Sequence, residues 1–131
     1  MSSPSRRIWL RSSVVIAIHD EQLAEHGGLP AVRSPELLES ALSRPVNTAA
    51  YADAADTILI GAMYAIGIAH NHPFIDGNKR VAWAAMNTFL ELNGITLVFE
   101  RADAVTAMLA LASGERTDDE FIAWVHAHAA R

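Results

Sequence analysis

Residues 70–80 read HNHPFIDGNKR, and this polar stretch separates the two most apolar segments of the chain. The segment before it, TILIGAMYAIGIA (residues 57–69), contains no charged residue, and the one after it, VAWAAMNTFLELNG (residues 81–94), contains only Glu91. Segments that are apolar on every side are typical of helices buried at the centre of a domain. The sequence therefore predicts two central helices joined by a polar loop.

Capping and spacing signals predict six helices in all. Ser12 or Ser13 is expected to cap the first, Ser34 the second, and Thr117 the last, where Glu120 completes a capping box. Pro45 is expected to end the second helix. The approximate ranges of the six are 12–28, 33–45, 56–70, 78–93, 102–114 and 117–129.

The remaining segments carry weaker signals. Residues 46–55 could form a short extended flap or a loop, and ITLVF (residues 95–99) could form one short strand. We therefore predict a mostly α, compact six-helix bundle, possibly with a short β segment or flap. At 131 residues it is expected to be a single domain, with residues 1–7 disordered or extended.

Composition excludes several classes of function. The formal net charge of −5 argues against direct nucleic-acid binding over a broad surface, and the lack of cysteine excludes disulfides and cysteine-ligated zinc. The longest apolar run is too short to cross a bilayer, and the N-terminus has no apolar core typical of a signal peptide. We expect a soluble, cytoplasmic protein without a membrane partner.

The polar loop has the chemistry of a phosphate site. A helix that starts near Asn78 directs its first backbone N–H groups, and the positive end of its dipole, toward the loop. Gly77 allows a ligand to approach the backbone, the Asn78 amide can donate, and Lys79 and Arg80 add positive charge.

Three other loop residues suggest further roles. Asp76 offers a hard oxygen ligand, and Mg²⁺ bound to nucleotide phosphates needs only one or two carboxylates. His72 could act as a base toward a hydroxyl that attacks the phosphate. Phe74 most simply packs into the core and holds the loop in shape. Each residue alone has an ordinary structural interpretation, but their combination within nine residues favours a Mg-nucleotide site.

The stretch HPFIDGNKR resembles the Fic/Doc signature, His-x-Phe-x-Asp/Glu-Gly/Ala-Asn-x-Arg, at every fixed position. The resemblance extends to IHDEQLAEHGGLP, LLESALSRP and FLELNG, and so covers most of the chain from about residue 8. It implies that His72 is the general base, that Asp76 holds Mg²⁺, and that an anion hole forms from Gly77, Asn78 and Arg80.

Two departures make the chain more similar to the death-on-curing toxins of this family. Nucleotidyl-transferring members usually carry Gly after the Asn and a second Arg three residues beyond the first, where this chain has Lys79 and Trp83. The toxin resemblance implies ATP as co-substrate, transfer of its γ-phosphoryl group to a protein hydroxyl, and translation elongation factor Tu as the target. Gly77 follows the nucleotidyl-transferring form instead.

The resemblance also implies control by a partner. Self-restrained members carry a helix with Ser/Thr-x-x-x-Glu, and the only such spacing here joins Thr96 to Glu100 in a predicted strand. A toxin that does not inhibit its own site implies inhibition by a separate, small antitoxin of the Phd type, whose disordered tail would fold onto the toxin.

Parts of the sequence are also compatible with other functions. A protein nucleotidyltransferase (AMPylation) and a catalytically silent binding module are the main alternatives. His19-Asp20 could belong to a metal-dependent phosphohydrolase of the HD type, but that class needs further His and Asp ligands. His70 and His72 could bind a metal together, but their spacing does not place them on one helix face.

Overall fold

The computed structural model describes residues 7–51 and 56–130, which form six α-helices and a two-stranded sheet. The mostly α prediction with six helices is confirmed. Of the segment predicted to be disordered or extended, residues 1–6 lie outside the described residues. The helices are α1 (Ser12–His26), α2 (Pro35–Tyr51), α3 (Thr57–Asn71), α4 (Asn78–Leu92), α5 (Arg101–Ser113) and α6 (Asp118–His128).

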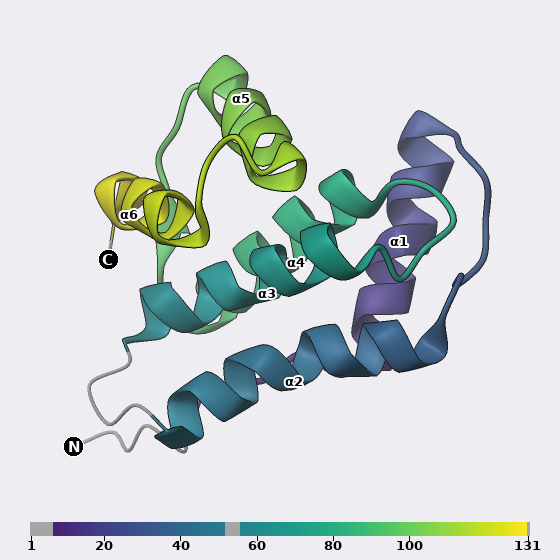
Figure 1. Ribbon diagram of the computed structural model, residues 1–131, viewed down its shortest axis with the longest axis horizontal. Helices are drawn as coiled ribbons and strands as arrows, with labels where there is room; N and C mark the ends of the chain where they lie inside the picture. Colours follow the sequence, from purple (N-terminus) through teal and green to yellow (C-terminus); the bar gives the residue numbers. More distant parts are fainter. Residues whose placement is uncertain (1–6, 52–55, 131) are drawn as a thin grey trace.

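Helix α3 occupies the centre of the fold, between α2 on one side and α5 and α6 on the other, with α4 packed along it (Figure 1). Asp56 caps its start by accepting a hydrogen bond from the Leu59 N–H at 2.7 Å. From Gly61 to Ala69 every residue is buried except the half-buried Met63. The prediction of a central buried helix is therefore confirmed.

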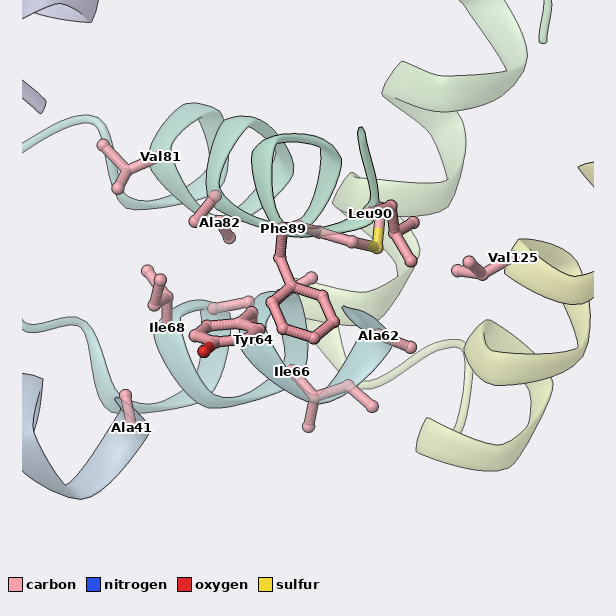
Figure 2. Close-up of a cluster of buried hydrophobic side chains, with 14 of the residues drawn as sticks. Ala41, Ala62, Tyr64, Ile66, Ile68, Val81, Ala82, Phe89, Leu90 and Val125 are labelled. Carbon is pink, nitrogen blue, oxygen red and sulfur yellow. The ribbon is translucent and has the colours of Figure 1, made fainter. Parts of the chain in front are cut away.

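The core is built mainly where α3 meets α4. Figure 2 shows Tyr64 and Phe89 packed together from the two helices, and their ring centroids lie 4.9 Å apart. The Tyr64 hydroxyl accepts a hydrogen bond from the Leu10 N–H, and burial raises the pKa of Tyr64. The core therefore fixes α3 and α4, the two helices that carry the polar loop between them.

Helix α2 differs from the prediction, because it continues through Pro45 to Tyr51. Pro45 has no N–H to donate to the Ala41 carbonyl, a loss that usually breaks a helix, but here Pro45 is buried in the fold. The Ala41 carbonyl instead faces α3, where a Cβ added to Gly67 would lie only 2.9 Å from its oxygen. Close packing of Ala41 and Pro45 in the fold therefore holds α2 in place at the proline, and the helix continues from there.

Two smaller predictions, on the cap of α1 and on the possible flap, also differ from the structure. Neither Ser12 nor Ser13 caps α1, because both lie inside its first turn and Arg11 occupies the N-cap position. Residues 46–51 of the possible flap belong to α2, and residues 52–55 lie outside the described part of the chain.

The expected strand is present as β1 (Thr96–Leu97), which pairs antiparallel with β2 (Ala129–Ala130). Thr117 and Glu120 form the predicted capping box at the start of α6. Within the described residues, none of the helices has both the length and the apolar character needed to span a membrane.

Candidate functional site

The polar loop, residues 72–77, leaves α3 through a strained residue. His72 is the C-cap of α3, its N–H bonds to the Ile68 carbonyl, and its backbone is left-handed, with φ 50° and ψ 56°. This conformation is unfavourable for a non-glycine residue, and Pro73 disfavours helical angles at the residue before it. The direction of the exposed His72 side chain therefore depends on a strained backbone conformation, which the surrounding structure must hold in place.

The connection between α1 and α2 holds the loop from outside. We call residues 28–34 the strap, and it runs beside the loop in Figure 1. The N–H groups of Arg33 and Ser34 both donate to the Pro73 carbonyl, at 2.7 and 3.1 Å. The Ile75 N–H donates to the Ala31 carbonyl, and Val32 and Phe74 form an antiparallel bridge. The loop is thus paired like a short strand with a segment about 40 residues earlier in the chain.

The side chain of Arg33 adds a second contact at the end of α3. Its Nε donates to the His72 carbonyl at 2.8 Å, and its Nη2 donates to the Asn71 carbonyl at 2.9 Å. These carbonyls lie at the negative end of the α3 dipole, where a cation is favourable. Arg33 therefore stabilises the backbone on which His72 is mounted.

The Asp76 carboxylate is exposed but held in orientation. Its Oδ1 accepts from the Gly77 N–H at 2.9 Å, and its Oδ2 accepts from the Leu29 N–H at 3.3 Å. A Cβ added to Gly28 would lie 2.9 Å from Oδ2, so the glycine permits this close approach of the strap.

This donor set fits magnesium bound to a nucleotide. Each carboxylate oxygen of Asp76 retains a free lone pair, and hard oxygen ligands suit Mg²⁺. Among the described residues there is no group of three or more His, Asp or Glu side chains able to hold a metal by themselves. Phosphate oxygens and water would therefore have to complete the coordination.

Helix α4 begins without a side-chain cap. Gly77 occupies the N-cap position with φ 78°, no side chain accepts from the first turn there, and that turn contains no acidic residue. Lys79 and Arg80 are both exposed in this turn, although cations are unfavourable at the positive end of a helix dipole. This start of a helix has the electrostatic character of an anion site.

The donation of the Asn78 amide to a phosphate stays a prediction, and the structure shows a further role of this side chain within the loop. Its Oδ1 accepts from the Phe74 N–H and its Nδ2 donates to the Phe74 carbonyl, both at 2.9 Å. The side chain thus closes the loop on itself, and only the backbone of Asn78 belongs to the start of α4. Phe74 is 1% exposed, as predicted for a residue that anchors the loop in the core.

Sequence reasoning assigned no role in the site to His19, Leu29 or Arg33. His19 is 2% exposed, its ring stacks on Phe74 with centroids 4.0 Å apart, and its Nε2 bonds to the Asp76 carbonyl at 2.9 Å. Both the His19 stretch and the strap belong to IHDEQLAEHGGLP and the residues just after it. The family resemblance included this region of the sequence, but only the fold shows that the region contacts the loop.

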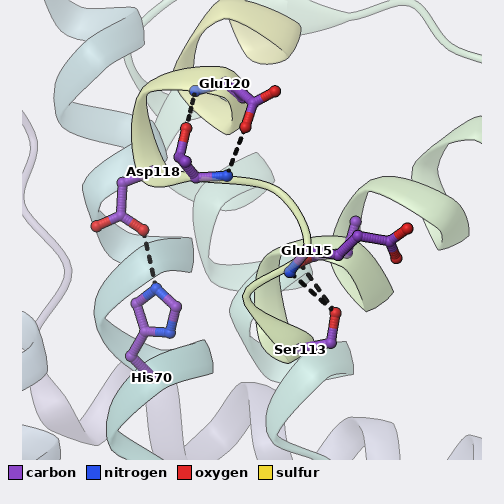
Figure 3. Close-up of polar contacts among 7 residues, drawn as sticks. His70, Ser113, Glu115, Asp118 and Glu120 are labelled. Atoms are coloured by element: carbon purple, nitrogen blue, oxygen red, sulfur yellow. Dashed lines mark hydrogen bonds and ion pairs between the residues drawn. The ribbon is translucent and has the colours of Figure 1, made fainter.

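Other polar residues lie apart from the loop. His70 turns toward α6, where its Nε2 lies 2.9 Å from Asp118 Oδ1, so it does not pair with His72 (Figure 3). Trp83 packs in an aromatic cluster, with ring centroids 4.9 Å from Phe99 and 5.9 Å from Trp124. A hollow of about 370 Å³ between the start of α1 and the middle of α2 includes no residue of the loop.

Comparison with known proteins identifies the family of the chain. Residues 9–90, which include the strap and the loop, match the sequence pattern of the Fic/DOC family. A protein kinase doc of Escherichia phage P1 is 33% identical over 101 residues, covering 77% of this chain and 79% of that protein. A toxin Doc of Mycolicibacterium smegmatis is 43% identical over 72 residues, covering 54% of this chain and 55% of that protein. The chain therefore belongs to the Fic/DOC family.

Proposed function

We propose that this protein is a toxin that transfers the γ-phosphoryl group of ATP to a hydroxyl of a target protein. The observation that carries the proposal is the combination, in one loop, of a strained His72 and an uncapped helix start bearing Lys79 and Arg80. The names of the two relatives, a protein kinase and a toxin, support the same function.

In the proposed reaction the imidazole of His72 accepts the proton of the target hydroxyl. The hydroxyl oxygen then forms a bond to the γ-phosphorus, the bond from that phosphorus to the β,γ-bridging oxygen breaks, and ADP leaves. Backbone N–H groups at the start of α4, with Lys79 and Arg80, bind the phosphate oxygens. Asp76 would hold magnesium, which neutralises phosphate charge when it is bound.

Trp83 favours phosphoryl over nucleotidyl transfer. Nucleotidyl-transferring members of the family usually carry a second Arg at this position. Here the position is occupied by an aromatic side chain that packs against Phe99 and Trp124. Gly77 supports the alternative, protein AMPylation. However, a Cβ at Gly77 would lie 3.9 Å from the His19 ring, which is ordinary contact, so space alone does not separate Gly from Ala here.

The test uses purified protein, ATP labelled separately at the α and γ positions, and elongation factor Tu as the first candidate target. The γ label should reach the target, and His72→Ala should reduce transfer by at least about 10²-fold without changing the melting temperature. His126→Ala, at an exposed histidine on α6, serves as the matched control. Transfer of the α label would favour AMPylation, and full activity of folded His72→Ala would refute the mechanism.

An antitoxin partner belongs to the same proposal. Thr96 lies in β1 and Glu100 precedes α5, so this pair does not form the helix that restrains other members of the family. We expect expression of the protein alone to arrest growth, and a Phd-like protein from a neighbouring reading frame to restore it by forming a complex. Arrest by the wild type but not by His72→Ala would link toxicity to transfer.

A further inference from the structure

His19 is a buried polar side chain, 2% exposed, and the proposed reaction does not use it. Burying an imidazole is costly unless its ring nitrogens find partners and its faces find packing. The ring packs on Phe74 at an interplanar angle of 15°, and Nε2 lies 2.9 Å from the Asp76 carbonyl oxygen. A carbonyl can only accept, so Nε2 carries the hydrogen of this bond.

The bond fixes the orientation of the peptide between Asp76 and Gly77. In a trans peptide the C=O and the N–H point in opposite directions, so a carbonyl directed at His19 turns the Gly77 N–H away from it. The N–H bonds there to Asp76 Oδ1, which places the carboxylate on the side opposite to His19. The hydrogen bond from α1 thus sets the direction of the Gly77 N–H, which holds the Asp76 carboxylate together with the Leu29 N–H of the strap.

Gly77 has φ 78°, and glycine has no side chain to hold its peptide in a single orientation. Without the His19 donor, the 76–77 peptide could rotate and carry the carboxylate with it. We propose that His19 is a positioning residue for the transfer reaction, holding the 76–77 peptide so that the Gly77 N–H keeps the Asp76 carboxylate facing the nucleotide phosphates. This inference rests on the proposed function for its activity readout but not for its structural one.

Three substitutions at His19 separate hydrogen bonding from packing. His19→Gln keeps an N–H donor at a similar reach, His19→Phe keeps the ring against Phe74 without a donor, and His19→Leu keeps neither. Asp20→Asn, at the exposed neighbouring residue, is the matched control. The two variants without a donor have different shapes, so the test survives if one of them fails to fold.

The first readout is the kinetics of transfer from ATP. We expect His19→Phe and His19→Leu to lower kcat by about 10- to 100-fold, the scale typical of a displaced reactive group, and His19→Gln to recover most of it. The melting temperatures should not follow this order, because His19→Phe keeps the buried stack. Equal losses for Gln, Phe and Leu would indicate a purely structural role and overturn the proposal.

The second readout is the amide NMR signal of Gly77 during titration with Mg²⁺ and ATP. In the wild type and His19→Gln the signal should shift on saturation, and in a folded donor-free variant the shift should be at least halved. An unchanged shift in His19→Phe or His19→Leu would overturn the proposal. If the wild type transfers no label at all, the proposed function fails while this signal still decides the role of His19.

Discussion

Helices α4 and α6 begin in opposite ways. At α6, Thr117 and Glu120 exchange hydrogen bonds with each other's backbone, and Asp118 and Asp119 add negative charge to the first turn (Figure 3). The cap bond also lowers the pKa of Glu120, as expected for a carboxylate that accepts from the backbone. At α4 the N-cap is a glycine without a side-chain acceptor, and the charges in the first turn are positive.

The difference indicates what each helix start contributes. The start of α6 satisfies its own N–H groups and complements its dipole, so it stabilises the fold. At the start of α4, the N–H groups of the first turn are left to water or to an anion. The positive charges of Lys79 and Arg80 add to the positive end of the helix dipole instead of balancing it. A site for phosphate is expected to show this pattern, because groups satisfied within the protein could not bind a ligand.

The strongest test of the contrast reverses charge at α4. Arg80→Glu should reduce phosphoryl transfer by about 10²-fold, because a charged hydrogen bond to phosphate is lost and replaced by repulsion. The free energy of unfolding should stay equal or rise by about 0.3–1 kcal/mol, because an acidic residue suits the start of a helix. Radiolabel transfer and urea denaturation measure the two effects.

Arg101→Glu is the matched control, since it makes the same change in the first turn of α5. It should leave transfer unchanged. If Arg80→Glu lowered the stability and spared transfer, the two helix starts would not differ in function.

The next largest effect is expected at Asn78. Asn78→Ala removes both side-chain bonds that close the loop on Phe74 and leaves two backbone groups without these partners. We expect the free energy of unfolding to fall by about 2 kcal/mol, together with a loss of transfer. Asn87→Ala removes a single bond to a carbonyl of its own helix and should cost less, which equilibrium denaturation of both variants can verify.

A smaller effect is expected at the other end of the loop, where the helix terminus is well matched. Arg33→Ala removes the cation from the C-terminal carbonyls of α3 and should lower kcat about 10-fold by loosening His72. Arg33→Lys can replace the charge but not both bonds of the planar guanidinium. Its kcat should therefore lie between those of Arg33→Ala and the wild type. A lysine variant as active as the wild type would show that the charge suffices and would contradict orientation of His72 by the two bonds.

The smallest effect on function is expected at α6. Thr117→Ala should lower the free energy of unfolding by about 1 kcal/mol, the usual cost of losing an N-cap side chain. Transfer by the folded fraction should not change, because the capping-box bonds join Thr117 to Glu120 and not to the loop. Thermal denaturation and the transfer assay on one preparation test both statements, and a parallel loss of activity would contradict the separation of the two regions.

Much of the fold followed from local signals in the sequence. The apolar segments around the loop, the Ser34 cap and the capping box are short-range patterns, and the structure contains each of them. Pro45 was misread, because its local effect is to break a helix while packing against α3 keeps α2 continuous.

The loop was recognised from its residue types, but its internal contacts were not. Nothing local indicates that the Asn78 side chain turns back to Phe74, since a donor near a phosphate site reads equally well as a ligand. His19 and Arg33 reach the loop from 57 and 39 residues away in the chain, distances at which only the packed fold decides which groups meet. Long-range hydrogen bonds of this kind carry no periodic signal.

The two parts of α2, before and after Pro45, should also differ in how easily their backbone hydrogen bonds open. Before the proline, Ala41 is pressed against Gly67 of the central helix, and Leu38 and Ala41 are buried. After it, Val46 is 45% exposed and Tyr51 is 90% exposed. Amide hydrogen exchange should therefore be slow before Pro45, where opening requires separation from α3, and fast in the last turns, which can fray alone.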